Sequence, residues 1–535
     1  SATSILSAEN NVSSFFAGIY LPRAYMIDPG LAGLQRVEVV KGPQSALYGR
    51  NAFAGAINYV PLSAPDHLTL DTYVTAGTDE RFDYGLTAGG PLIDGYVNAI
   101  AGYASSSFDG TWSNAHPNAD AEAGGTTDKM GGWETEASFA TVEVTPTDSL
   151  RFTLGINHLE RDTEATGRYN ISRDNGDGNC SLVGGVNQFF CGELPVLEAI
   201  VDPRSTGLVS TSDVYRFDAE YDLSETLTAF YQYGRIDSDA YSYDQTSINS
   251  VSGDTASGVQ FLGLPVGNVE ADSHELRLSY DTGATKATAG AFYSDLRDDY
   301  KTTLVFGTPL ATQPITPATA QIRVQDVLTE VLTKSVFASV SQDFSDGLIN
   351  IAIEGRYTEE EKTSYDRLSG SVSEATFDSF TPRFVAQYNV SEYSNVYASA
   401  AKGVKSGGFN SGNILASERA FQPEENWTYE IGSKNQLFDQ RLQLNANLFY
   451  VDWSNLQTLS VSGNPAFRGT LTRNVGGATS YGVEIDLVAR LTEELQAGFG
   501  FSYADPTYAD DLIDPRYQLM RNSAGIPIVI CDGVT

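Results

Sequence analysis

The dominant pattern in this 535-residue chain is an alternation of apolar and polar residues over stretches of about ten residues. In DVYRFDAEYDL (213–223), every second residue from Tyr215 to Leu223 is apolar, and charged residues lie between them. RLQLNANLFYVDW (441–453) and ELRLSY (275–280) repeat the pattern. A period of two predicts β-strands with one apolar and one polar face. A soluble β-sandwich would show the same alternation, so the strands alone leave the fold class open.

The connections between these strands are more informative. Short turns (DLSETL, DFSDGL, NVSEYSN, LFDQRL and RLTEEL) alternate with long polar segments near 106–131, 163–212, 238–270, 300–329, 403–423 and 455–473. Every second connection therefore emerges at the same end of the sheet, which is the layout of outer-membrane β-barrels. The chain has no run of 18 apolar residues, so no transmembrane helix is predicted.

The number of strands predicts a large barrel. Alternating segments between Leu68 and Tyr508 give about seventeen strands. Closed bacterial barrels contain an even number, and an open sheet edge in lipid is unfavourable. Plugged outer-membrane transporters have 22 strands, and the chain ends in NSAGIPIVICDGVT, which is typical of a loop. We therefore expect an all-β antiparallel transmembrane barrel that lacks about five C-terminal strands.

Composition excludes several classes of protein. The formal net charge of −35 argues against a nucleic-acid partner, which requires Lys and Arg. No H-E-x-x-H, G-x-S-x-G or Cys–His signature is present, which argues against an enzyme. The four histidines, His67, His116, His158 and His274, are scattered, and no C-x-x-C occurs, so neither a metal site nor a cofactor is expected. The opening SATSILSAENNVSS does not resemble a signal peptide; such a peptide was removed, or the N-terminus is missing.

Cysteine usage points to an oxidising compartment. Cys180 and Cys191 are close together in a polar stretch, as in a disulfide-closed external loop. Two free thiols in a cytosolic loop are the alternative. The third cysteine, Cys531, has no partner in this chain.

The stretch RVEVVKGPQSALYGRNAFAGAINYV (36–60) is glycine-rich and basic within an acidic chain. A phosphate-binding P-loop requires G-x-x-x-x-G-K-[ST]. Here Gly42 and Gly49 are too far apart, and Arg50 and Asn51 occupy the positions of Lys and Ser/Thr. A nucleotide-binding loop is therefore excluded.

The same stretch resembles the end of the plug domain of TonB-dependent outer-membrane receptors. The matching residues are Lys41, Gly42, Pro43, Tyr48, Gly49, Gly55, Ala56, Ile57 and Asn58. AGIYLPRAYMIDPGL upstream, and AAKGVKSGGFNSG, FQPEENWTYEIGSKNQLFDQRLQLNANLFYVDW and NVGGATSYGVEIDLVARL downstream, are also similar to the family. The resemblance implies an α/β plug inside the barrel lumen, with residues 1–61 as its C-terminal part, Pro61–Pro65 as a linker and 62–535 as the barrel. The family's N-terminal TonB-binding motif and the first half of the plug are absent.

The resemblance also implies an ion-pair lock between plug and barrel. Alternation places Glu430 and Glu484 toward the lumen, because their neighbours, such as Tyr429 and Ile485, take the outward positions. Family members pair carboxylates at these positions with plug arginines, which assigns the lock to Arg50 and Lys41. Lysine at position 41 departs from the family's arginine and cannot pair in the bidentate manner.

The function implied by the resemblance is uptake of a scarce solute across the outer membrane of a Gram-negative bacterium. Its partners would be the TonB energy-coupling complex, membrane lipid and a small ligand, most often a ferric siderophore, with haem, cobalamin, nickel complexes or glycans as variants. The loop aromatics Trp112, Phe189, Phe190, Tyr241 and Tyr243 are candidates for ligand contact or for plain surface residues. A passive porin and a structural or adhesive surface protein are the alternatives.

Overall fold

The computed structural model describes residues 11–509, except 29, 32, 47, 50–51, 114–128, 165–178, 183–185, 191–205, 246–258, 307–320 and 465–469. Within this part the chain is almost entirely β-structure, with two short 3-10 helices, η2 (Ala24–Met26) and η4 (Ala416–Glu418). No helix among the described residues is long and apolar enough to cross a membrane.

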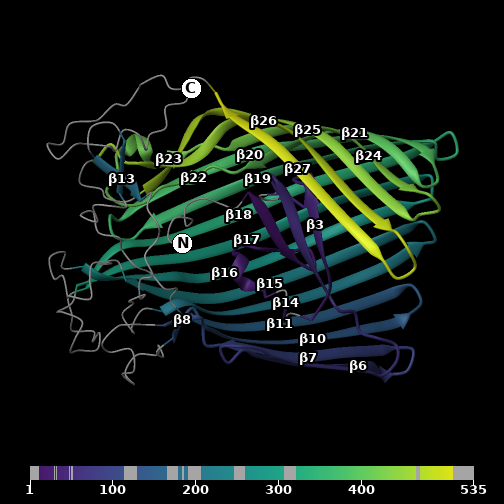
Figure 1. Ribbon diagram of the computed structural model, residues 1–535, viewed down its shortest axis with the longest axis horizontal. Coiled ribbons are helices and arrows are strands. Elements are labelled where there is room, and N and C mark those ends of the chain that lie inside the picture. Colours follow the sequence, from purple (N-terminus) through teal and green to yellow (C-terminus); the bar gives the residue numbers. More distant parts are fainter. Residues whose placement is uncertain are drawn as a thin grey trace.

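Seventeen described strands form one large closed barrel (Figure 1). They are β5 (Thr69–Ala76), β6 (Phe82–Ile93), β7 (Val97–Phe108), β10 (Trp133–Thr147), β11 (Leu150–Glu164), β14 (Thr206–Ser224), β15 (Leu227–Gln245), β16 (Val259–Asp281), β17 (Thr285–Phe306), β18 (Gln321–Phe344), β19 (Ile349–Asp366), β20 (Ser371–Ser391), β21 (Ser394–Lys405), β24 (Glu424–Leu437), β25 (Leu442–Val461), β26 (Thr470–Arg490) and β27 (Gln496–Tyr508). Each consecutive pair from β5 to β27 is antiparallel. The all-β antiparallel barrel and the number of strands are confirmed.

The odd number of strands differs from the even number expected for closed bacterial barrels. Residues 510–535 lie outside the described part of the chain. The further strands expected from the sequence therefore stay a prediction.

The connections confirm the layout with two exceptions. At one end, the strands are joined by turns of two to five residues, such as 148–149 and 491–495 (Figure 1, right). At the other end, two connections, 77–81 and 367–370, are equally short, so the alternation of short and long is not strict. The strands also extend into the segments that were expected to be long loops, as β16 does from Val259.

Four shorter strands form a separate sheet, the plug sheet, inside the barrel (Figure 1). They are β1 (Val12–Phe16), β2 (Ile19–Leu21), β3 (Leu34–Lys41) and β4 (Gly55–Pro61), in the order β2-β1-β4-β3. β1 runs parallel to β4, and the other two pairings are antiparallel. The sheet ends at Pro61 and the barrel begins at Thr69. The domain boundary at residues 61 and 62 stays a prediction.

Three two-stranded sheets lie outside the barrel and plug sheets. They pair β8 (Trp112–Ser113) with β9 (Lys129–Met130), β12 (Asn179–Leu182) with β13 (Val186–Phe190), and β22 (Gly408–Phe409) with β23 (Ala420–Phe421). Each connects residues of one interstrand segment at the end of the barrel opposite the short turns.

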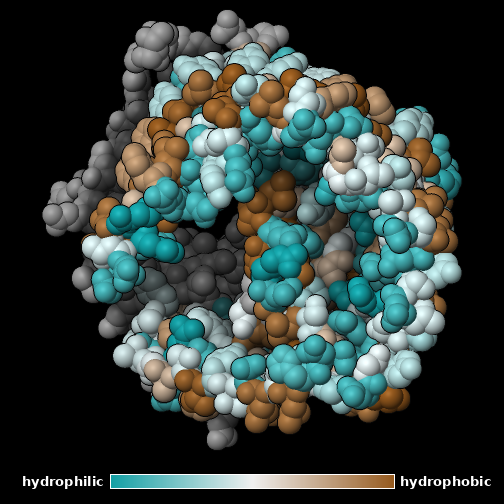
Figure 2. Space-filling model, turned by 90° about the vertical axis from the view of Figure 1, so that its right-hand side faces the viewer, coloured by the Kyte–Doolittle hydropathy of each residue, from teal (hydrophilic) through white to brown (hydrophobic). Residues whose placement is uncertain are grey.

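The two faces of the barrel wall differ in polarity, as the alternation predicted. Apolar residues such as Ile431, which is 59% exposed, and Leu278 point outward, because no protein atoms cover them. Seen from the end with short turns, hydrophobic patches lie around the outer edge of the barrel, and both hydrophilic and hydrophobic groups are visible inside it (Figure 2). Apolar side chains on the outside and polar ones within are the arrangement of a barrel that faces lipid.

Candidate plug–barrel lock

Of the predicted lock residues, Lys41 and Glu484 form a direct contact between plug and barrel. Lys41 ends β3, and its Nζ donates to Glu484 Oε2 on β26 at 2.9 Å. The Lys41 side chain is 68% exposed and that of Glu484 is 23% exposed. The hydrogen bond that Lys41 donates to Glu484, together with the negative charge of that carboxylate, raises the pKa of Lys41. The structure therefore brings Lys41 and Glu484 together in a solvated ion pair.

Glu430 points into the lumen but is held by the barrel wall. Tyr397 on β21 donates its hydroxyl to the carboxylate, and Asn447 Nδ2 on β25 donates to Glu430 Oε1 at 2.8 Å. Glu430 makes no hydrogen bond to Lys41, and its negative charge only adds to the rise in the pKa of Lys41. Arg50 lies outside the described residues, so its assignment to the lock stays a prediction.

The glycines of the plug motif allow close approaches between backbones. Gly49 has φ +79°, and a Cβ there would lie 2.7 Å from Cζ of Arg356 on β19. A Cβ on Gly55 would lie 2.6 Å from the carbonyl oxygen of Val40. Gly42 has φ +72° with no atom within 4 Å of its Cβ position, so its need for glycine comes from the turn alone.

The remaining motif residues hold the plug together. Asn58 Oδ1 accepts from the Gly18 amide at 3.2 Å, and its Nδ2 donates to Glu38 at 3.1 Å. The ring of Tyr48 packs against Phe15 at 5.1 Å between centroids. Pro43 Cβ lies 3.2 Å from the Cβ position of Gly403 on β21, which brings the motif against the barrel wall.

Sequence reasoning missed the contact between Gly49 and Arg356. Arg356 is 3% exposed, and its guanidinium lies over Phe292 at 5.2 Å and Phe337 at 5.1 Å. The alternation in β19 does place Arg356 inward, because the neighbouring Tyr357 points outward. A local pattern does not tell which inward residue meets the plug.

A second missed contact is a buried ion pair. Lys405 on β21 and Glu424 on β24 lie 2.9 Å apart, with side chains 5% and 1% exposed. Lys405 also donates to Asn11 Oδ1 of the plug at 3.0 Å. Glu424 accepts from Trp453 Nε1 at 2.5 Å and from the Gln457 amide at 2.9 Å. This pair has the extra hydrogen bonds that a buried pair needs to be stable.

The opposite side of the plug makes apolar contacts, which we call the apolar face. Plug residues of β1, β2 and η2 pack on strands β14, β15 and β16 in one buried cluster of Phe16, Ile19, Leu21, Met26, Ile27, Val214, Ile236 and Val269. A Cβ on Gly234 would lie 2.7 Å from Ile19, so the two surfaces are in close contact.

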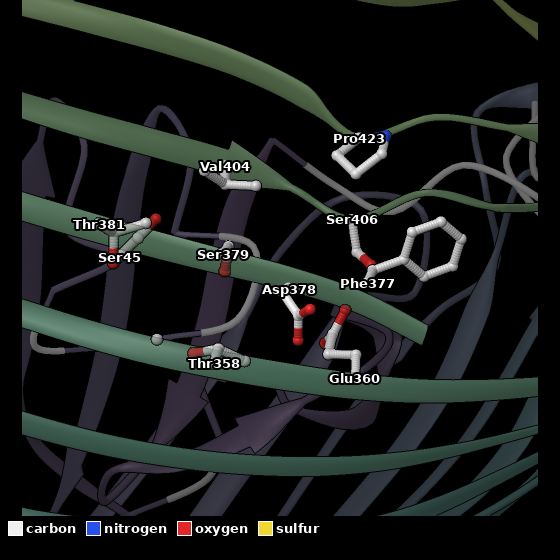
Figure 3. A pocket seen from close by; sticks show the side chains of 11 residues that line it. Ser45, Thr358, Glu360, Phe377, Asp378, Ser379, Thr381, Val404, Ser406 and Pro423 are labelled. Carbon is white, nitrogen blue, oxygen red and sulfur yellow. The ribbon is translucent and has the colours of Figure 1, made fainter. Parts of the chain in front are cut away.

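Around the Gly49 turn, by contrast, a small cavity of about 30 Å³ separates plug from wall (Figure 3). Its lining includes Ser45 of the plug, Thr358 and Glu360 of β19, Thr381 of β20, and Ser406. Buried Ser406 Oγ has no hydrogen-bond partner among the described residues. A polar space of this size is suited to a bound water. We call the contact of residues 41–53 with β19–β26 the polar face.

Several residues named from the sequence lie wholly or partly outside the described part of the chain. Cys191 and His116 lie outside the described residues, as do the side chains of Cys180, Phe189, Phe190 and Tyr243, so the disulfide stays a prediction. Trp112 and Tyr241 are about half exposed, at 48% and 45%. His158 lies between Asp213 and Glu160, and His274 bonds Tyr231. No group of three His, Cys, Asp or Glu within the described ranges is arranged to hold a metal ion.

Comparison with protein families decides the relationship. Residues 6–56 match the TonB-dependent receptor plug domain, and 299–525 match the TonB-dependent receptor-like β-barrel. The chain belongs to the TonB-dependent receptor family. Its family and its structural neighbours are receptors and transporters, and it is not an enzyme.

Individual relatives are distant. The metal-pseudopaline receptor CntO of Pseudomonas aeruginosa strain UCBPP-PA14 is 23% identical over 520 residues, which cover 91% of this chain and 66% of the relative. The chain thus spans just under two thirds of that relative's length. Two solved structures share its fold: the ferric yersiniabactin uptake receptor FyuA from Yersinia pestis and the siderophore receptor PiuA from Acinetobacter baumannii. Their TM-scores are 0.72 and 0.70, at 16% and 18% identity, covering 94% of this chain and 71% and 72% of theirs.

Proposed function

We propose that this receptor imports a metal chelate across the outer membrane of a Gram-negative bacterium with energy from a TonB complex. A ferric siderophore is the first candidate for this chelate. The observation that carries the proposal is the solvated Lys41–Glu484 pair between plug and wall. Exposed pairs stabilise by only about 0–1 kcal/mol. A plug held there by such a contact can be released by a modest input of energy.

The choice of solute rests on the relatives. Their names specify a metal-pseudopaline complex, ferric yersiniabactin and siderophores. We therefore extend to this chain the class of chelated metal ions rather than a single compound. The lock assigned to Lys41 and Glu484, with Arg50 as a further member, belongs to the same proposal.

The test is uptake of radioactive iron by cells that express the full-length receptor. Iron is supplied as catecholate, hydroxamate and carboxylate chelates, with a nickel chelate in parallel. We expect uptake of at least one chelate that is lost when TonB is deleted or the proton gradient is collapsed. Uptake independent of TonB would instead support a passive porin. Absence of uptake together with altered cell attachment would support an adhesive protein.

A further inference from the structure

We propose that the solute passes between the polar face of the plug and strands β19–β26, while the apolar face stays seated on β14–β16. This inference rests on the uptake function proposed above and specifies its route. It follows from three features of the described residues: the nature of the two contacts, the cavities on one side, and the polar lining below them.

The apolar and polar faces of the plug differ in which side chains become exposed to water when the plug moves away from the barrel wall. On the apolar face, moving the plug would expose eight buried apolar side chains to water, and each fully buried large one contributes about 1.5–3 kcal/mol. On the polar face, Phe53 packs against Trp453 of β25 with 5.3 Å between ring centroids. Ser45 faces hydroxyl and carboxylate groups across a water-sized space, and Gly49 contacts the guanidinium of Arg356. Water can replace the contacts of Ser45 and Gly49, so separation here exposes fewer apolar side chains than on the apolar face. The polar face is therefore the side that opens.

The upper part of the route is the cavity beside the Gly49 turn. Figure 3 shows Thr358 and Glu360 projecting from one strand, with Ser45 next to Thr381 across the space. Phe377 and Ser406 lie at its other end. Displacing the turn would widen this cavity along a wall that already carries hydroxyls and a carboxylate.

The lower part of the route is a second cavity of about 390 Å³ at the end of the barrel with short turns. Its lining is polar and includes Asn395, Lys434, Gln443 and Asn445 of β21, β24 and β25. β24 also contains Glu430, which lies four residues before Lys434 along the strand. Polar side chains thus continue from the lock toward this mouth of the barrel.

Between the two cavities, the wall has groups suited to a hydrated solute. Glu430 on β24 and Glu484 on β26 lie on either side of β25, and Asn447 of β25 is opposite Glu484 in the β25–β26 register. Buried Asn447 Oδ1 has no hydrogen-bond partner within the described residues. A buried polar atom without a partner indicates a place for water or a polar ligand. The route therefore fits a polar, hydrated solute rather than an apolar one.

Two disulfide clamps test the route. Pro43→Cys with Gly403→Cys would fasten the polar face, because the two Cβ positions lie 3.2 Å apart, near the usual disulfide range of about 3.5–4.5 Å. Ile19→Cys with Gly234→Cys would fasten the apolar face, because Ile19 Cγ1 and Cγ2 lie 2.7 and 2.9 Å from the Gly234 Cβ position. Each variant in reductant is its own control for folding.

The first readout is TonB-dependent uptake of the iron chelate that the unmodified receptor imports. The 43–403 clamp should abolish uptake until reductant is added, and the 19–234 clamp should leave it unchanged. Block by the 19–234 clamp with transport through the 43–403 clamp would overturn the route.

The second readout needs no chelate and no TonB. Purified receptor in a planar lipid bilayer is exposed to increasing urea, and ion conductance is recorded as the plug loosens. The 43–403 clamp should prevent the conductance that the unmodified and 19–234 proteins develop. Equal conductance in both clamped proteins would overturn the route. If only TonB-dependent uptake fails, that result counts against the proposed function, and the conductance measurement still decides the route.

Discussion

The plug touches the barrel wall through two surfaces that differ in character, although Arg23 next to the apolar face also pairs with Asp298 of the wall. The apolar face buries side chains such as Ile19 and Met26 against β14–β16. The polar face brings Gly49 and Lys41 against Arg356 and Glu484 on β19 and β26. Hydrophobic contacts are non-directional and lost only by exposing area, whereas solvated charge pairs exchange readily with water. One domain can thus be anchored on one side and releasable on the other.

The largest expected effect concerns the buried Lys405–Glu424 pair near the polar face. Lys405→Met would leave Glu424 buried without its counter-ion, and breaking a buried pair costs about 3–5 kcal/mol. The control is Lys402→Met, which removes a pair with Glu425 on the same two strands. That pair has the same 2.9 Å separation but is more exposed, at 19% and 41%, and is worth about 0–1 kcal/mol. In urea unfolding monitored by protease digestion of the plug, Lys405→Met should unfold at a lower urea concentration than Lys402→Met. Equal losses of stability in the two variants would contradict the account.

The apolar face is tested by Met26→Ala. Met26 is fully buried, and truncation of a buried Met to Ala costs about 2–5 kcal/mol. Val39→Ala, at a plug position that is 65% exposed, should change the free energy of unfolding by no more than about 0.5 kcal/mol. Plug release in urea should therefore occur earlier for Met26→Ala only. An unchanged midpoint would mean that the apolar face does not anchor the plug.

The Gly49 turn is tested by Gly49→Ala against Gly42→Ala. Both glycines have positive φ, and a non-glycine residue there costs about 1–3 kcal/mol. Only the alanine at 49 would also meet Arg356. We expect Gly49→Ala to loosen the plug more than Gly42→Ala, measured by protease sensitivity of the plug. Identical sensitivities would show that the close approach of Arg356 is unimportant.

The smallest effect is expected at the exposed lock. Lys41→Gln and Glu484→Gln should each lower the stability of the seated plug by about 0–1 kcal/mol, and the double variant by no more than either alone. Because the pKa of Lys41 is raised, the contribution of the pair is complete below about pH 10.4 and is lost as the pH rises through the raised value. Plug release measured from neutral to high pH checks this.

Glu430→Gln is the matched control for the lock. Its carboxylate accepts hydrogen bonds from Tyr397 and Asn447 of the wall and makes no hydrogen bond or ion pair with a described plug residue. We expect plug release to be unchanged in this variant and to become easier in Glu484→Gln only. A larger effect of Glu430→Gln would move the lock from Glu484 to Glu430.

The sequence was sufficient for the wall and insufficient for the plug contacts. Alternation fixes which residues face inward, so Glu484 and Glu430 could be placed in the lumen without coordinates. It carries no information about depth, so Glu430 could not be distinguished from Glu484 as the partner of Lys41. Arg356 was passed over for the same reason, although its inward position was readable.

Two further differences have physical causes. β15 and β16 extend to Gln245 and from Val259, well into the segment 238–270 that was expected to be a loop. The backbone pairing of the two strands continues there to Gln245 and Phe261, whereas pattern reading depends on alternating side chains. The alternation pattern also did not predict the plug's apolar face, because short strands such as β2 have too few residues to show a period of two.

Labelling of wall cysteines that the plug covers is the most direct test of the comparison. Thr381→Cys lies in the polar-face cavity and Val214→Cys in the apolar cluster, and the native side chains are 3% and 2% exposed. Each is introduced singly into a receptor in which Cys180, Cys191 and Cys531 are replaced by serine. The account predicts that a maleimide in the lumen labels position 381 faster than position 214, and that urea widens the difference. Equal rates, or faster labelling at 214, would contradict it.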